Sequence, residues 1–206
     1  MKFIIEHLDK RLYKWCFLEY KHISTVVGRD KVMFTNVSGK TSKEKLAGFG
    51  TVFSDSIANS KNIVNSKNVL SKRICVLDPF TEKTLSKDDK TKFDYFVFGG
   101  ILGDYPPQKR TAGFCDKLRA KGIKFETRNL GKEQMSTDTA VYVAKKILEG
   151  KKLSDLKFKD TIIIKINESE EVELPFRYVV EIDKQGKENL ILPDGFVEFL
   201  KKRKSF

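Results

Sequence analysis

The segment at residues 93–111, FDYFVFGGILGDYPPQKRT, restricts the possible folds of this chain more than any other. Its first half, with Phe93, Tyr95 and Val97, is typical of a strand that is buried on both faces in an α/β sheet. Three glycines and an aspartate follow within the next seven positions. Because glycine lets other groups approach the backbone closely, the carboxyl end of this strand is a predicted ligand edge.

Two common phosphate-binding motifs do not fit this loop. A dinucleotide fingerprint needs GxGxxG that runs directly into a helix, and a P-loop needs Gly-Lys-Ser/Thr at its end. Here Pro106 and Pro107 follow soon after the glycines, and two successive prolines prevent a helix from starting at once. The loop therefore binds a different kind of ligand, or it is a glycine turn that only permits close packing.

Strand-like and helix-like segments alternate at short spacing along most of the chain. Strands are expected at 2–5, 32–35, 73–77, 93–98 and 123–127, and helices at 12–27, 41–50, 86–92, 111–121 and 140–149. This alternation predicts an α/β fold with a mostly parallel sheet. Strands at 161–166 and 173–182, the second interrupted by Pro175, and a helix at 193–202 then predict a C-terminal β-hairpin and helix. The expected domains are a core at 1–150 and an extension at 151–206 packed on it.

A repeated six-residue unit, NSKNIV followed by NSKNVL, occupies residues 59–70 within a background rich in Ser, Asn and Lys. Twelve residues are too few for a solenoid, so the segment at 54–72 is interpreted as a polar surface insertion. It is not expected to mark a domain boundary.

Length and composition limit the class of protein. A chain of 206 residues with 40% hydrophobic residues can bury a full core. No apolar run approaches the length of a membrane span, and the N-terminus is too short and too acidic for a signal peptide, so a cytoplasmic protein is expected. Cys16, Cys75 and Cys115 are far apart and odd in number, which argues against a disulfide framework or a zinc site and predicts buried thiols.

The formal net charge of +12 favours polyanionic partners such as RNA or the ribosome. Most of the cations are Lys rather than Arg, so the guanidinium forks that recognise phosphate specifically are few. Such a bias can also reflect base composition alone. Contact with RNA or the ribosome and a merely compositional origin both remain open at this stage.

Several polar residues stand where a site could form. Glu6 and His7 end the first expected strand, and Asp78 and Pro79 close the strand at 73–77. Ser136 or Thr137 can cap the helix that follows the loop at 128–139, and the small residues after them allow close packing. Glu19 lies in the middle of the helix at 12–27, a position where a glutamate is most often solvated.

Six segments are shared with one known class of enzyme: IIEH at 4–7, WxxLEY at 15–20, LDP at 77–79, FDYFVFGGILGDxPPxxRT at 93–111, LGxxQMxTDTA at 130–140 and PFRYV at 175–179. Through them the chain resembles the SPOUT-class methyltransferases, and within this class the family of the fungal SPOUT protein-arginine methyltransferase and its eukaryotic and archaeal relatives. The segments span nearly the whole chain. The insertion at 54–72 has no counterpart among them.

The resemblance implies a SPOUT fold, with a deep trefoil knot formed within about residues 73–150, and S-adenosylmethionine bent among three knot loops. It implies no metal. Carried over by position, the cofactor-binding residues are Leu77, Asp78, Pro79, Gly99, Gly100, Ile101, Leu102, Gly103, Leu130, Gly131, Gln134, Met135, Thr137 and Thr139. The three loops that they form are the same three stretches that stand out on physical grounds.

The resemblance also implies an acceptor, which is an arginine of the third protein of the small ribosomal subunit, and a monomethylarginine product made by a monomeric enzyme. A guanidinium is charged at any working pH, so carboxylates are needed to hold it and to orient one nitrogen. Glu19, Asp104 and Glu6 are the candidates, because each lies in a shared segment. The alternative is a SPOUT RNA methyltransferase acting on rRNA or tRNA, and a ribosome-binding factor without turnover is a further, weaker reading.

Overall fold

The computed structural model describes residues 1–59, 73–100 and 110–202, and the structural statements below concern these residues. Most of the predicted insertion lies outside the described residues. So do the four predicted site residues Ile101, Leu102, Gly103 and Asp104.

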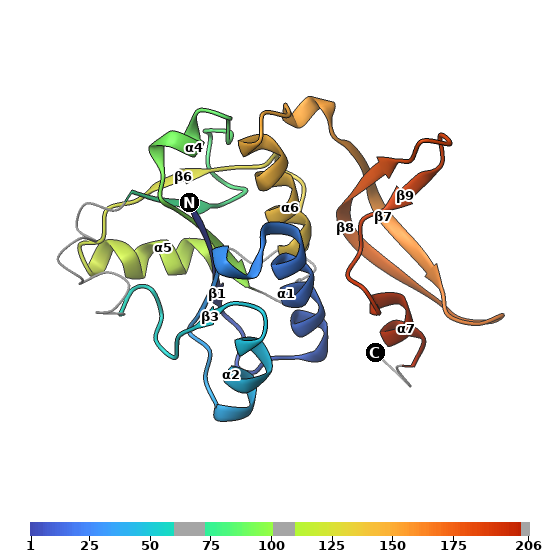
Figure 1. Ribbon diagram of the computed structural model, residues 1–206, viewed down its shortest axis with the longest axis horizontal. Coiled ribbons are helices and arrows are strands. Elements are labelled where there is room, and N and C mark those ends of the chain that lie inside the picture. Colours follow the sequence, from blue (N-terminus) through green and yellow to red (C-terminus); the bar gives the residue numbers. More distant parts are fainter. Residues whose placement is uncertain (60–72, 101–109, 203–206) are drawn as a thin grey trace.

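The core of the protein is a six-stranded sheet in which every neighbouring pair of strands is parallel (Figure 1). The strands run in the spatial order β3-β2-β1-β5-β4-β6. Their bounds are β1 Lys2–His7, β2 Val32–Thr35, β3 Thr51–Val52, β4 Ile74–Leu77, β5 Tyr95–Gly100 and β6 Glu126–Arg128. The predicted parallel α/β sheet is confirmed.

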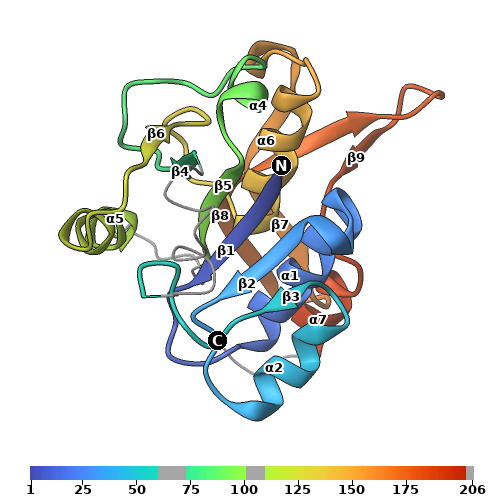
Figure 2. The same cartoon turned by 60° about the vertical axis from the view of Figure 1, so that its left-hand side comes forward.

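Helices cover both faces of this sheet, which explains why its strands are apolar on both sides. Successive residues of β1 belong to different cores, with Phe3 and Ile5 on one face and Ile4 on the other. The first face packs against α1 (Lys14–Val27), α2 (Lys40–Ala47) and α6 (Thr137–Leu148). The opposite face packs against α5 (Arg110–Ala120), which Figure 2 shows on its own side of the sheet. The one-turn helix α4 (Asp89–Lys92) precedes β5.

The strand order reverses between β1 and β5, and this position is where ligands bind in open α/β sheets. The pairing of the two strands ends at His7 and Gly100, so both residues stand at the carboxyl edge of the sheet. A Cβ atom on Gly100 would overlap the hydroxyl of Tyr20 and would lie 2.9 Å from Cγ2 of Ile5. Gly100 is therefore needed for the packing of α1 on the sheet, whatever else it does.

We expect Gly100→Ala to destabilise the fold by about 1–3 kcal/mol, because the added methyl overpacks a closed core. Gly113→Ala in α5 is the matched control, since a Cβ there meets nothing within 4 Å and alanine favours a helix. Thermal unfolding of both variants measures the difference. An unchanged melting temperature together with lost S-adenosylmethionine binding would instead place Gly100 directly against the ligand.

A second sheet of three antiparallel strands is formed by the C-terminal part of the chain, in the order β7-β8-β9. It consists of β7 Lys157–Lys165, β8 Glu171–Ile182 and β9 Glu188–Leu190, followed by α7 Phe196–Lys201. In Figure 1 the helices α1 and α6 lie between the two sheets. Leu18 of α1 belongs to the core of the second sheet, and Val179 of β8 belongs to the core of the first, so the extension packs on the core.

In the extension, β7 begins at residue 157 rather than 161, β8 at 171 rather than 173, and α7 at 196 rather than 193. The extension also differs from the sequence prediction in two larger respects. It contains a third strand, β9, whose three residues are all exposed and give no apolar pattern. The predicted interruption at Pro175 is wrong, because β8 runs continuously past it. The ladder between β7 and β8 instead shifts its register between Asp160 and Ile162, opposite Pro175 and Phe176. A proline is tolerated at such a bulge because it has no N–H to donate to the ladder.

Several elements of the core also differ from the prediction. Strand β1 spans 2–7 rather than 2–5, β5 spans 95–100 rather than 93–98, and the helices α1, α2 and α4 are shorter than predicted. Strand β3 was missed because two residues show no periodicity. Strand β6 begins at Glu126 rather than at Ile123, and Ile123 and Phe125 pack as a loop against the second core cluster. The helix predicted at 140–149 begins one turn earlier, at Thr137. None of the described helices has the length and apolar character needed to cross a membrane. The knot stays a prediction.

Candidate active site

Three side chains on α1 form a stripe along one face of the helix. Trp15, Glu19 and His22 are separated by four and three residues, so their side chains lie above one another. The indole Nε1 of Trp15 donates a hydrogen bond of 2.7 Å to Oε1 of Glu19. Glu19 is only 3% exposed, although a glutamate at this position is most often solvated. A buried carboxyl in a helix needs a specific environment, and α6 supplies part of it.

The first turn of α6 faces this stripe with a second buried carboxylate. Oδ2 of Asp138, a residue 1% exposed, lies 2.8 Å from Nδ1 of His22. Its Oδ1 accepts a hydrogen bond of 2.7 Å from the hydroxyl of Ser136. Ser136 is the N-cap residue but makes no side-chain cap hydrogen bond. The capping role predicted for this hydroxyl is therefore wrong, and the hydroxyl orients Asp138 instead.

The two carboxyls influence each other electrostatically. Burial raises the pKa of Glu19 well above its ordinary value, and the nearby charge of Asp138 raises it further, against the hydrogen bonds from Trp15 and Thr137. The pKa of Tyr178 in β8 is also raised by burial, with added contributions from Glu19 and Asp138. The charges of Glu19 on α1 and Asp138 on α6 thus both act on Tyr178 of β8, and we call these three residues the acid cluster.

The acid cluster borders the carboxyl edge of the parallel sheet. Thr137, the first residue of α6, hydrogen-bonds Glu19 and also places its hydroxyl 3.4 Å from the carbonyl oxygen of Gly99. Gly99 and Gly100 end β5, which is the strand of the predicted ligand loop. One threonine therefore connects the buried carboxyl of α1 to the strand end at the switch point.

The described members of the three predicted cofactor loops come together at this edge. Leu77 ends β4, and the next residue, Asp78, donates its backbone N–H to the carbonyl of Arg128 at the end of β6. Because β4 lies between β5 and β6, the loops after all three strands are neighbours. The residues so placed are Leu77, Asp78, Pro79, Gly99, Gly100, Leu130, Gly131, Gln134, Met135, Thr137 and Thr139. Their cofactor contacts stay predictions.

The last of these loops is attached to the C-terminal sheet. The carbonyl of Gln134 accepts a hydrogen bond of 2.8 Å from the backbone N–H of Arg177, and Met135 forms a parallel bridge with the same residue. Gly131 has a φ of 98°, a conformation that other residues rarely adopt. The loop is therefore shaped by glycine at one end and held by β8 at the other.

Glu6 does not join the acid cluster. It is 1% exposed, and its Oε2 accepts hydrogen bonds from the hydroxyl of Thr35 at 2.5 Å and from the N–H of Ile57 at 3.1 Å. Burial raises the pKa of Glu6, and bonds from Ser56 and Thr35 oppose the shift. These contacts attach β2 and the segment at 56–57 to the end of β1. They give Glu6 a structural role, and we do not carry it into the acceptor site.

His7 is a second buried polar group at the same strand end. Its Nδ1 lies 2.9 Å from the hydroxyl of Tyr20, while its Nε2 is buried with no hydrogen-bond partner among the described residues. Burial lowers the pKa of His7, which favours the neutral ring. The predicted placement of a polar residue at this edge is confirmed.

The sequence prediction missed three members of this region, namely His22, Asp138 and Tyr178. The helical spacing of residues 15, 19 and 22 was the available signal for His22. Asp138 and Tyr178 lay in the shared segments at 130–140 and 175–179, and neither segment by itself shows which helix it would face. No pattern within one segment shows that these three would meet.

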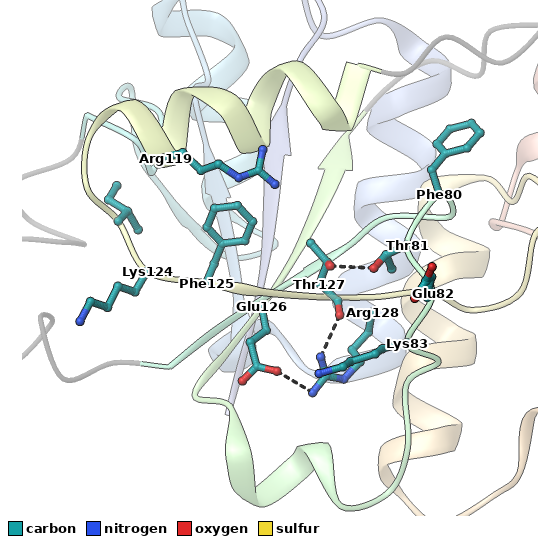
Figure 3. A pocket seen from close by; sticks show the side chains of 11 residues that line it. Phe80, Thr81, Glu82, Lys83, Arg119, Lys124, Phe125, Glu126, Thr127 and Arg128 are labelled. Carbon is teal, nitrogen blue, oxygen red and sulfur yellow. Dashed lines mark hydrogen bonds and ion pairs between the residues drawn. The ribbon is translucent and has the colours of Figure 1, made fainter.

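An open pocket of about 680 Å³ runs along strand β6 at the edge of the sheet, away from the acid cluster (Figure 3). Arg119 lies over the ring of Phe125 at its side, 5.3 Å from the centroid. Much of the positive charge that lines the pocket is compensated, because Arg128 pairs with Asp89 and Arg119 pairs with Asp116. The pocket therefore gives little support to an RNA-binding surface, although the whole chain is basic.

The three cysteines are free and buried, as predicted. In the described parts of the chain, no group of three or more His, Cys, Asp and Glu side chains is arranged to hold a metal ion. The chemistry available at the sheet edge is thus that of buried carboxyls, a histidine, a tyrosine and open backbone.

The chain matches, over residues 2–205, the family described as protein arginine N-methyltransferase SFM1-like. It is 37% identical over 209 residues to protein arginine N-methyltransferase SFM1 of Saccharomyces cerevisiae, covering 98% of this chain and 95% of the relative. The crystal structure of the yeast arginine methyltransferase SFM1 complexed with SAM has a TM-score of 0.83 to this structure at 35% identity, covering 98% of this chain and 90% of the other. The complex of the yeast enzyme with SAH gives the same TM-score at 34% identity, covering 97% and 94%.

Proposed function

Because the chain belongs to the SFM1-like family of protein arginine N-methyltransferases, we propose that it transfers the methyl group of S-adenosylmethionine to an arginine side chain. The observation that carries this proposal is the position of Glu19. A buried carboxyl stands beside the end of β5, connected to it through Thr137. A site for a charged guanidinium requires such a group.

The described residues fit the cofactor. Gly99 has no side chain at the switch point, and Gly131 bends its loop through a positive φ, so backbone groups are accessible at both places. Leu77 at the end of β4, Leu130 after β6 and Thr137 at the start of α6 complete the edge. When bound, S-adenosylmethionine supplies the methyl group and a sulfur leaving group.

The protein's own part in the reaction is positioning and charge. Glu19 holds the guanidinium by charge-assisted hydrogen bonds and turns one nitrogen towards the methyl group. The transfer releases one proton in total, since substrate and product arginine are both cations at neutral pH. Asp138 and His22 offer a route for it, because they contact each other and the His22 side chain is 13% exposed to solvent.

The finer proposal concerns the substrate and the product. The acceptor is an arginine of the third protein of the small ribosomal subunit, the product is monomethylarginine, and the enzyme acts as a monomer. This proposal rests on the resemblance of the six shared segments to the family. A ribosomal substrate also agrees with the net charge of +12, which suits a surface rich in RNA phosphates.

Labelling with tritiated S-adenosylmethionine tests the proposed function. Small ribosomal subunits that lack the modification are incubated with the protein, and the product is divided between RNase and protease treatments. We expect the label to survive RNase, to be released by protease, and to elute as monomethylarginine after hydrolysis. Label found only in RNase-sensitive material would replace this function by RNA methylation.

A further inference from the structure

Tyr178 carries a buried hydroxyl that makes no hydrogen bond within the described part of the chain. The residue is 2% exposed, and its Oη has no hydrogen-bond partner in the described chain. Buried tyrosine hydroxyls normally find a partner, and leaving one without a partner destabilises the fold. A phenylalanine would fill the same space without this cost. The hydroxyl therefore points to a ligand that is absent from the free protein.

The backbone holds Tyr178 in a fixed position. The neighbouring residue Arg177 donates its N–H to Gln134, and its guanidinium makes two hydrogen bonds, of 2.5 and 2.8 Å, with the carboxylate of Asp160. Side chains alternate along a strand, so Tyr178 points to the opposite face of the sheet from Arg177. On that face its ring belongs to a core cluster that includes Leu18 of α1 and Phe196.

The surroundings of the hydroxyl indicate the chemistry of its ligand. Trp15 donates a hydrogen bond to Glu19 and packs against the core cluster that contains Tyr178, so the Glu19 carboxyl lies next to that cluster. The charges of Glu19 and Asp138 also both raise the pKa of Tyr178. Carboxylates only accept hydrogen bonds, and a phenol can accept as well as donate. A guanidinium has five N–H donors in a fixed planar fork and no acceptor. It is the side chain that suits several converging acceptors.

We propose that Tyr178 belongs to the acceptor site, where its hydroxyl hydrogen-bonds the arginine guanidinium held by Glu19. This inference rests on the proposed function. It makes the C-terminal sheet part of the active site rather than only a packed extension, since β8 supplies one of the groups that touch the substrate. The same strand also fixes the loop at 130–139, so acceptor and cofactor are positioned from one element.

Tyr178→Phe tests the proposal because it removes the hydroxyl and keeps the ring. We expect kcat/KM for an arginine-containing substrate peptide to fall about tenfold or more, while the Kd of S-adenosylmethionine stays within twofold. The melting temperature should stay equal or rise, because an unsatisfied buried group is lost. Tyr142→Phe is the control, since the Tyr142 hydroxyl already bonds Glu181; its kcat/KM should stay unchanged and its melting temperature should not rise.

A binding measurement separates this proposal from the proposed function. Calorimetry with N-acetyl-arginine amide reports guanidinium binding without methyl transfer. If the wild type binds this probe and Tyr178→Phe binds it several-fold more weakly, the site is supported even where arginine methylation is not observed. If the wild type methylates arginine and Tyr178→Phe leaves kcat, KM and probe affinity unchanged, the proposal is overturned while the function stands. Absence of probe binding to the wild type also overturns it.

Discussion

Glu19→Gln should lower the turnover of the arginine substrate by about 100-fold or more, the scale expected for loss of a specific transition-state contact. The replacement keeps the shape of the side chain and an oxygen that can accept the hydrogen bond from Trp15. It removes the charge that balances the guanidinium. S-adenosylmethionine affinity should stay within a few-fold, because among the described residues Glu19 is linked to the cofactor edge through Thr137 rather than by direct contact.

The same variant should be as stable as the wild type or more stable. The folded-state pKa of Glu19 is raised above its unfolded value, so the folded protein binds this proton more tightly than the unfolded chain does. Stability from this group is therefore present at low pH and is lost as the pH rises through the raised pKa. Glutamine has no proton to lose. The stability difference in favour of the variant should grow with pH.

The measurements are single-turnover kinetics, calorimetry with S-adenosylmethionine and thermal unfolding at several pH values. Glu44→Gln is the matched control, because Glu44 is exposed on α2 and its ion pair with Lys40 spans 3.9 Å on the surface. It should leave turnover and stability nearly unchanged. Normal turnover in Glu19→Gln would mean that the carboxyl is structural. A large loss of cofactor affinity would mean that it acts through the cofactor loop.

The parallel sheet could be predicted because its strands carry the signal locally. The run around Val97 is apolar on both faces, and the buried strand β2 matches its predicted bounds at residues 32–35. Strands β3 and β9 could not be predicted, because two or three residues show no period. Pro175 misled the prediction, since its tolerance depends on a bulge that arises only when β7 and β8 pair.

The candidate site was predictable only in part for a similar reason. The glycines at the end of β5 and the polar residues at the ends of β1 and β4 follow from strand ends in the sequence. The acid cluster does not, because Glu19, Asp138 and Tyr178 come from elements that meet only in the folded protein. Glu6 looked equivalent to Glu19 in the sequence. The difference is that the Glu6 carboxylate already accepts hydrogen bonds from Thr35 and Ile57.

The pH dependence of acceptor binding should follow the protonation of Glu19. Its pKa is raised by burial and by Asp138, so at low pH the free enzyme holds a neutral carboxyl that cannot pair with a guanidinium. The guanidinium can then pair with Glu19 only after this proton is removed, which weakens its binding. We expect kcat/KM for the arginine peptide to rise with pH, by up to about tenfold per pH unit, at pH values above the ordinary pKa of a glutamate. The rise should level off once the pH exceeds the raised pKa of Glu19.

Other titratable groups lie near Glu19, so the assignment needs a comparison of variants. They are Asp138 from α6, Cys16, Tyr20 and His22 from α1, and Tyr178 from β8. The rising limb should disappear from the residual activity of Glu19→Gln and persist in Tyr178→Phe, which loses no charge in this range. The Kd of S-adenosylmethionine, measured over the same pH values, shows whether the rise in kcat/KM comes from binding of the acceptor rather than of the cofactor. An identical rise in wild type and Glu19→Gln would show that it does not come from Glu19, and the guanidinium would then be held by another group.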